Sequence, residues 1–131
     1  MSAVSEKGRA VMPPDNEDSR IRRVFALAES DPIPRVSQDT LLKYRAFLET
    51  ALSFPFQALY AETTAPVRRL FHCVVVLGLS ETTNRRASAL MVRVQNAQGE
   101  IEIPLAELGV REDDPNHELV DDFAYWFWNW R

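Results

Sequence analysis

Hydrophobic residues recur every three or four positions in three segments of the chain, which is the spacing of one helix face. The clearest segment predicts a helix over residues 38–52, with Ser37 as a favourable N-cap. Its apolar stripe consists of Leu41, Tyr44, Leu48 and Leu52. Residues 19–29 predict a short amphipathic helix with basic residues on its far side. Residues 115–130 predict a C-terminal helix that starts at Asp114-Pro115, a favourable N-cap followed by proline.

Between the second and third helices the pattern changes to short apolar or alternating runs, which are typical of strands. The predicted strands are residues 56–62, 71–79, 90–96 and 100–104. The run over 71–79 is almost continuously apolar, as expected for a strand that is buried on both faces. Turns are predicted at residues 63–66 and 96–99, a polar loop at 80–88, and a single helical turn at 105–108.

This order of elements predicts an α+β fold. We expect a small, mostly antiparallel β-sheet, or an SH3-like partly open barrel, with an N-terminal and a C-terminal helix packed on it. Residues 1–18 lack apolar periodicity and are expected to be disordered. Prolines at positions 32 and 34 interrupt the chain. We therefore expect residues 1–36 to be a flexible tail with a short helix, and residues 37–131 to be one compact domain.

Composition and charge narrow the class of protein. The chain has 131 residues, 46% of them hydrophobic, and its apolar runs are far shorter than a membrane span requires. A single cysteine, Cys73, is compatible with a reducing, cytoplasmic location. Residues 100–131 carry nine acidic and two basic side chains, which disfavours nucleic acid and favours a cation or a basic partner. No nucleophile is placed beside a base, so we expect no enzyme activity.

The acidic residues cluster where the C-terminal helix is predicted to begin. They are Asp113, Asp114, Glu118, Asp121 and Asp122. Glu118, Asp121 and Asp122 are three and four positions apart, so they share a helix face. Helical spacing places Asp121 and Asp122 opposite the apolar face of this helix, on its solvent side. Calcium prefers several carboxylate oxygens, although acids at a helix start are also favourable without any ion because of the helix dipole. The absence of a DxDxDG loop excludes an EF-hand.

Two further patterns in the same helix are compatible with functions other than calcium binding. His117, Glu118 and Asp121 resemble part of a zinc-binding helix, but no third ligand is in view, so a zinc site is not expected. Six of the eight residues 123–130 are aromatic. Most are expected in the core, but six cannot all point one way. Tyr125, Trp126 or Trp128 is therefore a candidate for an exposed contact with a protein partner.

Several segments, in this order and spacing, resemble the CcbP-like family of small calcium-binding proteins over about residues 40–127. These segments are Phe47-Leu48-Glu49, Leu52-Ser53-Phe54-Pro55-Phe56, Ala65-Pro66, Val74 to Leu79, Met91 to Val94, Ile103 to Leu108 and Asp121 to Trp126. The resemblance implies an α/β protein, without an EF-hand, that binds calcium through acidic side chains. It adds Glu49 and Glu81 to the candidate ligands and places the C-terminal acids at matching positions.

The chain departs from the family pattern at two places. Thr50 stands where a second acid is usual, and the loop after the 71–79 strand keeps only Glu81 while Arg85 and Arg86 have entered it. Two positive charges oppose a dication, so the calcium site is expected to be degenerate. The alternative function is a protein-interaction module that uses the aromatic C-terminal helix or the basic N-terminal segment, without metal.

Overall fold

The computed structural model describes residues 16–64, 68–80 and 89–131 of the chain. Outside these residues lie positions 1–15 of the disordered lead expected over 1–18, the centre of the 63–66 turn, Glu81 and the loop with Arg85 and Arg86. Glu17 and Asp18, which were also expected in the disordered lead, are helical. The described elements, in chain order, are α2 (Glu17–Val24), α3 (Gln38–Ala51), β1 (Phe56–Thr64), β2 (Arg68–Leu79), β3 (Met91–Asn96), β4 (Gly99–Pro104), the 3-10 helix η1 (Leu105–Glu107), β5 (Leu108–Gly109) and α4 (His117–Asn129).

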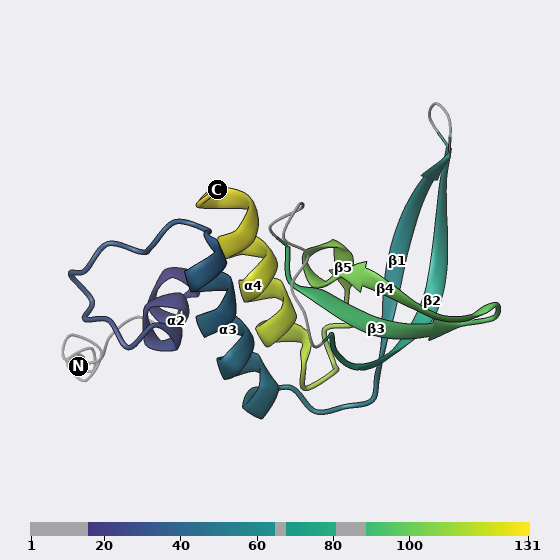
Figure 1. Ribbon diagram of the computed structural model, residues 1–131, viewed down its shortest axis with the longest axis horizontal. Coiled ribbons are helices and arrows are strands. Elements are labelled where there is room, and N and C mark those ends of the chain that lie inside the picture. The colour runs from purple at the N-terminus through teal and green to yellow at the C-terminus, as the bar shows by residue number, and fades with distance from the viewer. Residues whose placement is uncertain (1–15, 65–67, 81–88) are drawn as a thin grey trace, which may run out of the picture.

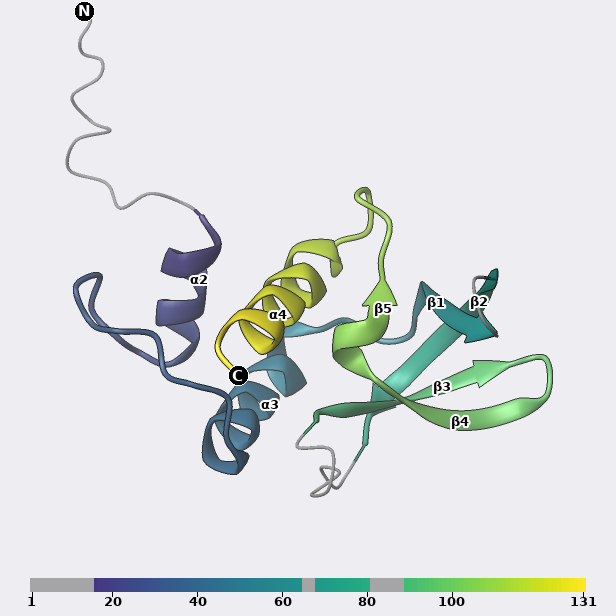
Figure 2. The same ribbon diagram turned by 90° about the horizontal axis from the view of Figure 1, so that it is seen from above.

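The strands form one open antiparallel sheet with the order β4-β3-β2-β1-β5. The α-helices gather at one side of this sheet, with α4 beside β5 and with α2 and α3 beyond it (Figures 1 and 2). The fold is therefore α+β, as the sequence predicts, in the form of an open sheet. The two-residue strand β5 is not foreseen, because a pair of residues carries no periodicity.

The predicted apolar stripe of α3 lies in the core. Leu41, Tyr44 and Leu48 are almost fully buried, and Leu52 follows directly after the last helical residue. Ser37 caps the helix in a capping box with Thr40: the Thr40 amide donates to the Ser37 hydroxyl over 3.2 Å, and the Ser37 amide donates to the Thr40 hydroxyl over 2.8 Å. Sequence and structure agree on this helix because capping and periodicity are both local signals.

The sheet buries one face more than the other. In β2, Val74 and Val76 are buried. On the opposite face of the same strand, Cys73 is exposed and Val75 is half-buried. The expectation that β2 is buried on both faces is thus wrong, because no described helix covers its second face. β1 and β2 also pair further than predicted, with Thr63 opposite Arg69 and Thr64 opposite Arg68, so the turn between them starts later.

The helix at residues 17–24 starts and ends earlier than the predicted 19–29. The Asn16 side chain caps it by accepting from the Ser19 amide over 2.9 Å, and the chain leaves helical geometry at Ala26, whose φ is 57°. Ile21 is fully buried in the core and Ile33 nearly so. Part of the segment expected as a tail therefore packs against the domain, and the flexibility expected of residues 1–36 stays a prediction.

Candidate functional site

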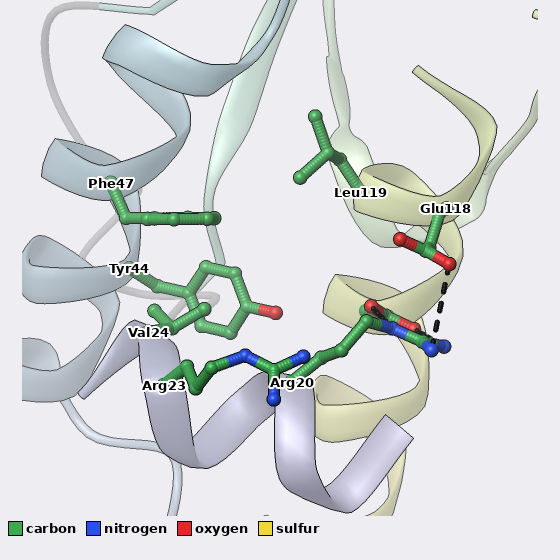
Figure 3. A pocket seen from close by; sticks show the side chains of 8 residues that line it. Arg20, Arg23, Val24, Tyr44, Phe47, Glu118 and Leu119 are labelled. Atoms are coloured by element: carbon green, nitrogen blue, oxygen red, sulfur yellow. Dashed lines mark hydrogen bonds and ion pairs between the residues drawn. The ribbon is translucent and has the colours of Figure 1, made fainter. Parts of the chain in front are cut away.

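Three helices enclose a cavity of about 340 Å³ that contains two of the predicted calcium ligands. Its lining residues are Arg20, Arg23, Val24, Tyr44, Phe47, Glu118, Leu119 and Asp122. Helix α2 supplies both arginines, α3 supplies the aromatic rings, and α4 supplies the carboxylates (Figure 3). The cavity therefore brings together residues from both ends of the chain, with carboxylates and guanidinium groups in equal number.

Asp122 is the most buried of the predicted acidic ligands that the structure describes, with a side chain that is 8% exposed. Both of its carboxylate oxygens accept hydrogen bonds from Arg20, from Nε over 2.6 Å and from Nη2 over 2.9 Å. Helical spacing had placed Asp122 on the solvent side of α4. That placement is wrong because α2, which lies far away in the sequence, covers this side of the helix.

Glu118 stands one turn before Asp122 and completes the contact with the same arginine. Its Oε2 lies 3.5 Å from Nη1 of Arg20, and its side chain is 59% exposed. Arg20 thus lies between two carboxylates that are four positions apart on α4, which is where a dication bound by both would have to lie. A guanidinium that pairs in a bidentate manner is a strong partner for a carboxylate.

Tyr44 adds a neutral hydroxyl to the cavity. Its ring packs in the core at 5.0 Å from the centroids of Phe123 and Trp126. Figure 3 shows its hydroxyl group directed into the space between α2, α3 and α4. Burial raises the pKa of Tyr44 above its ordinary value, and the charge of Asp122 acts in the same direction. The phenol is therefore protonated at neutral pH and cannot serve as an anionic ligand.

The turn before α4 holds two more of the predicted ligands, both already engaged. Exposed Asp113 accepts from Arg111 Nε over 3.1 Å and from Nη2 over 3.0 Å, and this pairing lowers the pKa of Asp113. Asp114 accepts from the Asn116 amide over 2.7 Å. The helix begins at His117, after the predicted start at Pro115. The reason is that the Asn116 side chain bonds the backbone of Ser53 and does not cap the helix: its Oδ1 accepts from the Ser53 amide over 2.8 Å, and its Nδ2 donates to the Ser53 carbonyl over 3.0 Å.

Glu49 lies on α3, apart from the α4 acids, and faces another arginine. Its Oε2 is 3.2 Å from Arg45 Nη1, and Arg45 also donates to the Ser80 carbonyl from Nε and Nη2, at 3.0 Å and 2.6 Å. Arg45 therefore connects Glu49 to the last described residue before the loop that contains Glu81. Asp121 is exposed on α4.

The predicted acids are suitable for calcium by chemistry but not by arrangement. Carboxylate oxygens are the donors that calcium takes, and a site needs six to eight oxygen ligands. Among the residues that the structure describes, no group of three or more His, Cys, Asp or Glu side chains could hold a metal ion. The two carboxylates that border one cavity both contact Arg20. Within the described ranges, the predicted acids therefore do not come together around one point as a complete calcium site.

Of the aromatic candidates for partner contact, two reach the surface. Trp128 is 50% exposed and Tyr125 is 36% exposed, whereas Trp126 is fully buried. Trp126 packs against Tyr44 and Phe123 and donates its Nε1 hydrogen to the Pro34 carbonyl over 2.9 Å. An exposed Trp126 was one of the predicted options, and the structure excludes it because the helix turns this residue into the core.

The arginines are the residues that sequence reasoning missed. Arg20 contacts both Asp122 and Glu118, and Arg45 contacts Glu49. Arg20 and Asp122 are 102 positions apart in the sequence. The available signal was complementary charge, since the 19–29 segment carries a basic face and the C-terminal helix an acidic one. The pattern could not say that these two faces meet.

By its fold, the protein belongs to the class of small α+β domains with an open antiparallel sheet. Its acidic helix, α4, packs beside α2 and α3. The family model Calci_bind_CcbP, described as calcium binding, matches residues 35–127. The chain therefore belongs to the CcbP calcium-binding family, whose ligand is calcium, and the resemblance noted from the sequence is confirmed.

The solved structure of CcbP from Anabaena is similar to this one. Its TM-score is 0.62 at 18% sequence identity, and the match covers 89% of this chain and 93% of that chain. At this identity the similarity shows the shared fold. No curated protein sequence matches the chain. None of the helices in the described part of the chain is long and apolar enough to cross a membrane.

Proposed function

We propose that this chain is a small cytoplasmic calcium-binding protein, without enzyme activity, whose acidic site is degenerate. Family membership is the observation that carries the proposal. The candidate ligands that support it are Glu118, Asp121 and Asp122 on α4, with Asp113 and Asp114 in the preceding turn. Glu49 and Glu81 are the further candidates, which the family resemblance adds.

The expected affinity follows from the arginine contacts. Asp122, Asp113 and Glu49 each already pair with a guanidinium group of the same chain. Calcium must compete with these groups for the carboxylate oxygens. We therefore expect a dissociation constant on the order of 10⁻⁴ to 10⁻³ M, as in weak calcium modules.

Calcium titration followed by calorimetry and by melting temperature tests this function, with magnesium as the control ion. Calcium at ten times its dissociation constant should stabilise the fold by about 1.4 kcal/mol, which raises the melting temperature by roughly 5 °C. No heat and no shift at 10 times the upper expected constant, roughly 10 mM calcium, would end the calcium proposal.

Variants of the exposed acids test the site. Glu118→Gln combined with Asp121→Asn removes two candidate ligand charges and leaves the Arg20 pair with Asp122 intact. This double variant should lose most of the calcium-dependent rise in melting temperature. Glu107→Gln combined with Glu29→Gln removes two other exposed acids and should keep the rise. If both variants keep it, calcium binds elsewhere and the α4 assignment is wrong.

The second candidate function is a protein-interaction module, which the exposure of Trp128 favours. Its indole donates to the Ala106 carbonyl over 3.3 Å, and the Arg131 guanidinium lies 5.3 Å from its ring centroid. The basic N-terminal segment is the weaker option, because Arg20 and Arg22 already bond within the chain. A partner cross-linked to the native chain but not to a Trp128→Ala variant of native stability would support this function.

A further inference from the structure

The cavity between α2, α3 and α4 has a polar side and an apolar side. Figure 3 shows Arg20 and Arg23 on the α2 side of the Tyr44 ring, whereas Phe47 and Leu119 lie on the other side. Its volume of about 340 Å³ falls within the range of small-molecule sites, roughly 300–1,000 Å³. Apolar walls with a few polar groups that fix the orientation are typical of such sites. The cavity therefore suits a small ligand with a polar head and an apolar body.

The Tyr44 hydroxyl is the group that points to a ligand. Tyr44 is only 1% exposed, and Figure 3 shows its hydroxyl directed into the cavity. None of the described residues forms a hydrogen bond with this hydroxyl. A buried hydroxyl without a partner has lost the hydrogen bonds that it makes in water, so an acceptor in the cavity would stabilise it. The phenol is protonated at neutral pH and donates, and a carboxylate is the strongest acceptor for it.

The charges that border the cavity determine the net charge of the ligand. Two guanidinium groups face two carboxylates, so the lining as a whole is neutral. Glu118 is 59% exposed, and its contact with Arg20 is long at 3.5 Å, so its carboxylate retains the capacity to accept from an ammonium group. Arg23 has five N–H donors and supplies a cationic donor for a carboxylate. A neutral lining that contains both signs of charge favours a zwitterion over an ion of one sign.

We propose that this cavity binds an α-amino acid with an apolar side chain. The ligand carboxylate accepts hydrogen bonds from the Tyr44 hydroxyl and the Arg23 guanidinium. The ligand ammonium group donates to Glu118. The apolar side chain packs between Phe47 and Leu119. The ion pair that joins α2 to α4 stays intact, so binding requires no displacement of α2 and no metal ion. This ligand is additional to calcium, and its site does not depend on the calcium-binding function.

A set of small probes tests the class of ligand on the native chain in metal-free buffer, by calorimetry and by melting temperature. L-Leucine and L-phenylalanine should both bind. At a probe concentration of about 10 mM, a dissociation constant of about 1 mM raises the melting temperature by roughly 5 °C. Isoamylamine lacks the carboxylate of leucine and glycine lacks its apolar side chain, so each should bind at least about tenfold more weakly. Isocaproate lacks only the ammonium group, whose partner is exposed, and should bind about threefold more weakly.

Two variants test the position of the ligand. Tyr44→Phe removes only the cavity hydroxyl and should weaken L-leucine binding at least about tenfold. Tyr60→Phe on β1, outside the cavity, is the matched control and should bind like the native chain. Glu118→Gln should weaken L-leucine binding about threefold and leave isocaproate binding unchanged, because isocaproate has no ammonium group. In the native chain, L-leucine should shift the backbone NMR signals of residues 20–24, 44–47 and 118–122, a measurement that needs no variant.

The possible results separate this site from the calcium site. No melting shift with either amino acid at about 10 mM overturns the proposal. Isocaproate that binds as tightly as L-leucine overturns it as well, because the zwitterion is then not recognised. Unchanged L-leucine affinity in Tyr44→Phe, or NMR shifts confined to other residues, places the binding elsewhere and also overturns it. All of these measurements are made without metal, so none of them affects the calcium-binding function, and a failure of calcium binding leaves this site standing.

Discussion

The ion pair between Arg20 and Asp122 should be a main determinant of the stability of the helical side of the domain. The perturbation is Arg20→Met, measured together with Asp122→Asn and with the double variant, all in metal-free buffer. Arg20→Met leaves a carboxylate that is 8% exposed without its partner. Removal of one member of a buried ion pair is costly because the remaining charge has lost its compensation.

The magnitude follows from burial and geometry. Breaking a buried pair costs about 3–5 kcal/mol, and the neighbouring cavity lets water approach Asp122, so we expect about 3 kcal/mol for Arg20→Met. Asp122→Asn keeps an acceptor but loses the charge, which costs about 2 kcal/mol because Arg20 is 19% exposed and can be hydrated. The double variant should lose about 3 kcal/mol, which implies a coupling of about 2 kcal/mol between the two residues.

Urea unfolding, followed by tryptophan fluorescence and by circular dichroism, gives the four free energies of this cycle. Arg20→Met should also melt roughly 10 °C below the native chain. The exposed contact of Arg20 with Glu118 is not expected to matter, so Glu118→Gln serves as the control of nearly native stability. A loss below 1 kcal/mol for Arg20→Met, on the order of an exposed pair, would refute the reasoning, as would losses that simply add.

Three further predictions concern the fold. Gly99→Ala should cost about 1–2 kcal/mol in urea unfolding because φ is 131°, although a Cβ would meet nothing within 4 Å; Gly109→Ala, without that φ, should be nearly neutral. Ser37→Ala should cost about 1 kcal/mol through the lost capping box. The pKa of Tyr44 is raised in the folded state, so the unfolded chain loses this proton first as pH rises above 10.0. Stability should therefore fall above that pH, and less steeply in Tyr44→Phe.

The parts of the fold that the sequence predicts are those set by local signals. The stripe from Leu41 to Leu48 and the cap at Ser37 both lie within α3, and the structure places them as expected. The errors lie where the outcome depends on distant segments. The exposure of Cys73 depends on which sheet face is covered by helices, and the start of α4 depends on the bonds between Asn116 and Ser53.

The candidate site shows the same division more sharply. The acids of α4 could be predicted because their spacing on one helix is a local property. The same spacing puts Asp122 on the solvent side of α4, whereas it is buried, because the position of α2 is not encoded in the α4 pattern. The resemblance supplied calcium as the ligand, and the match over residues 35–127 begins after α2. The partner of Asp122 therefore lies in the part of the chain that the family match does not include.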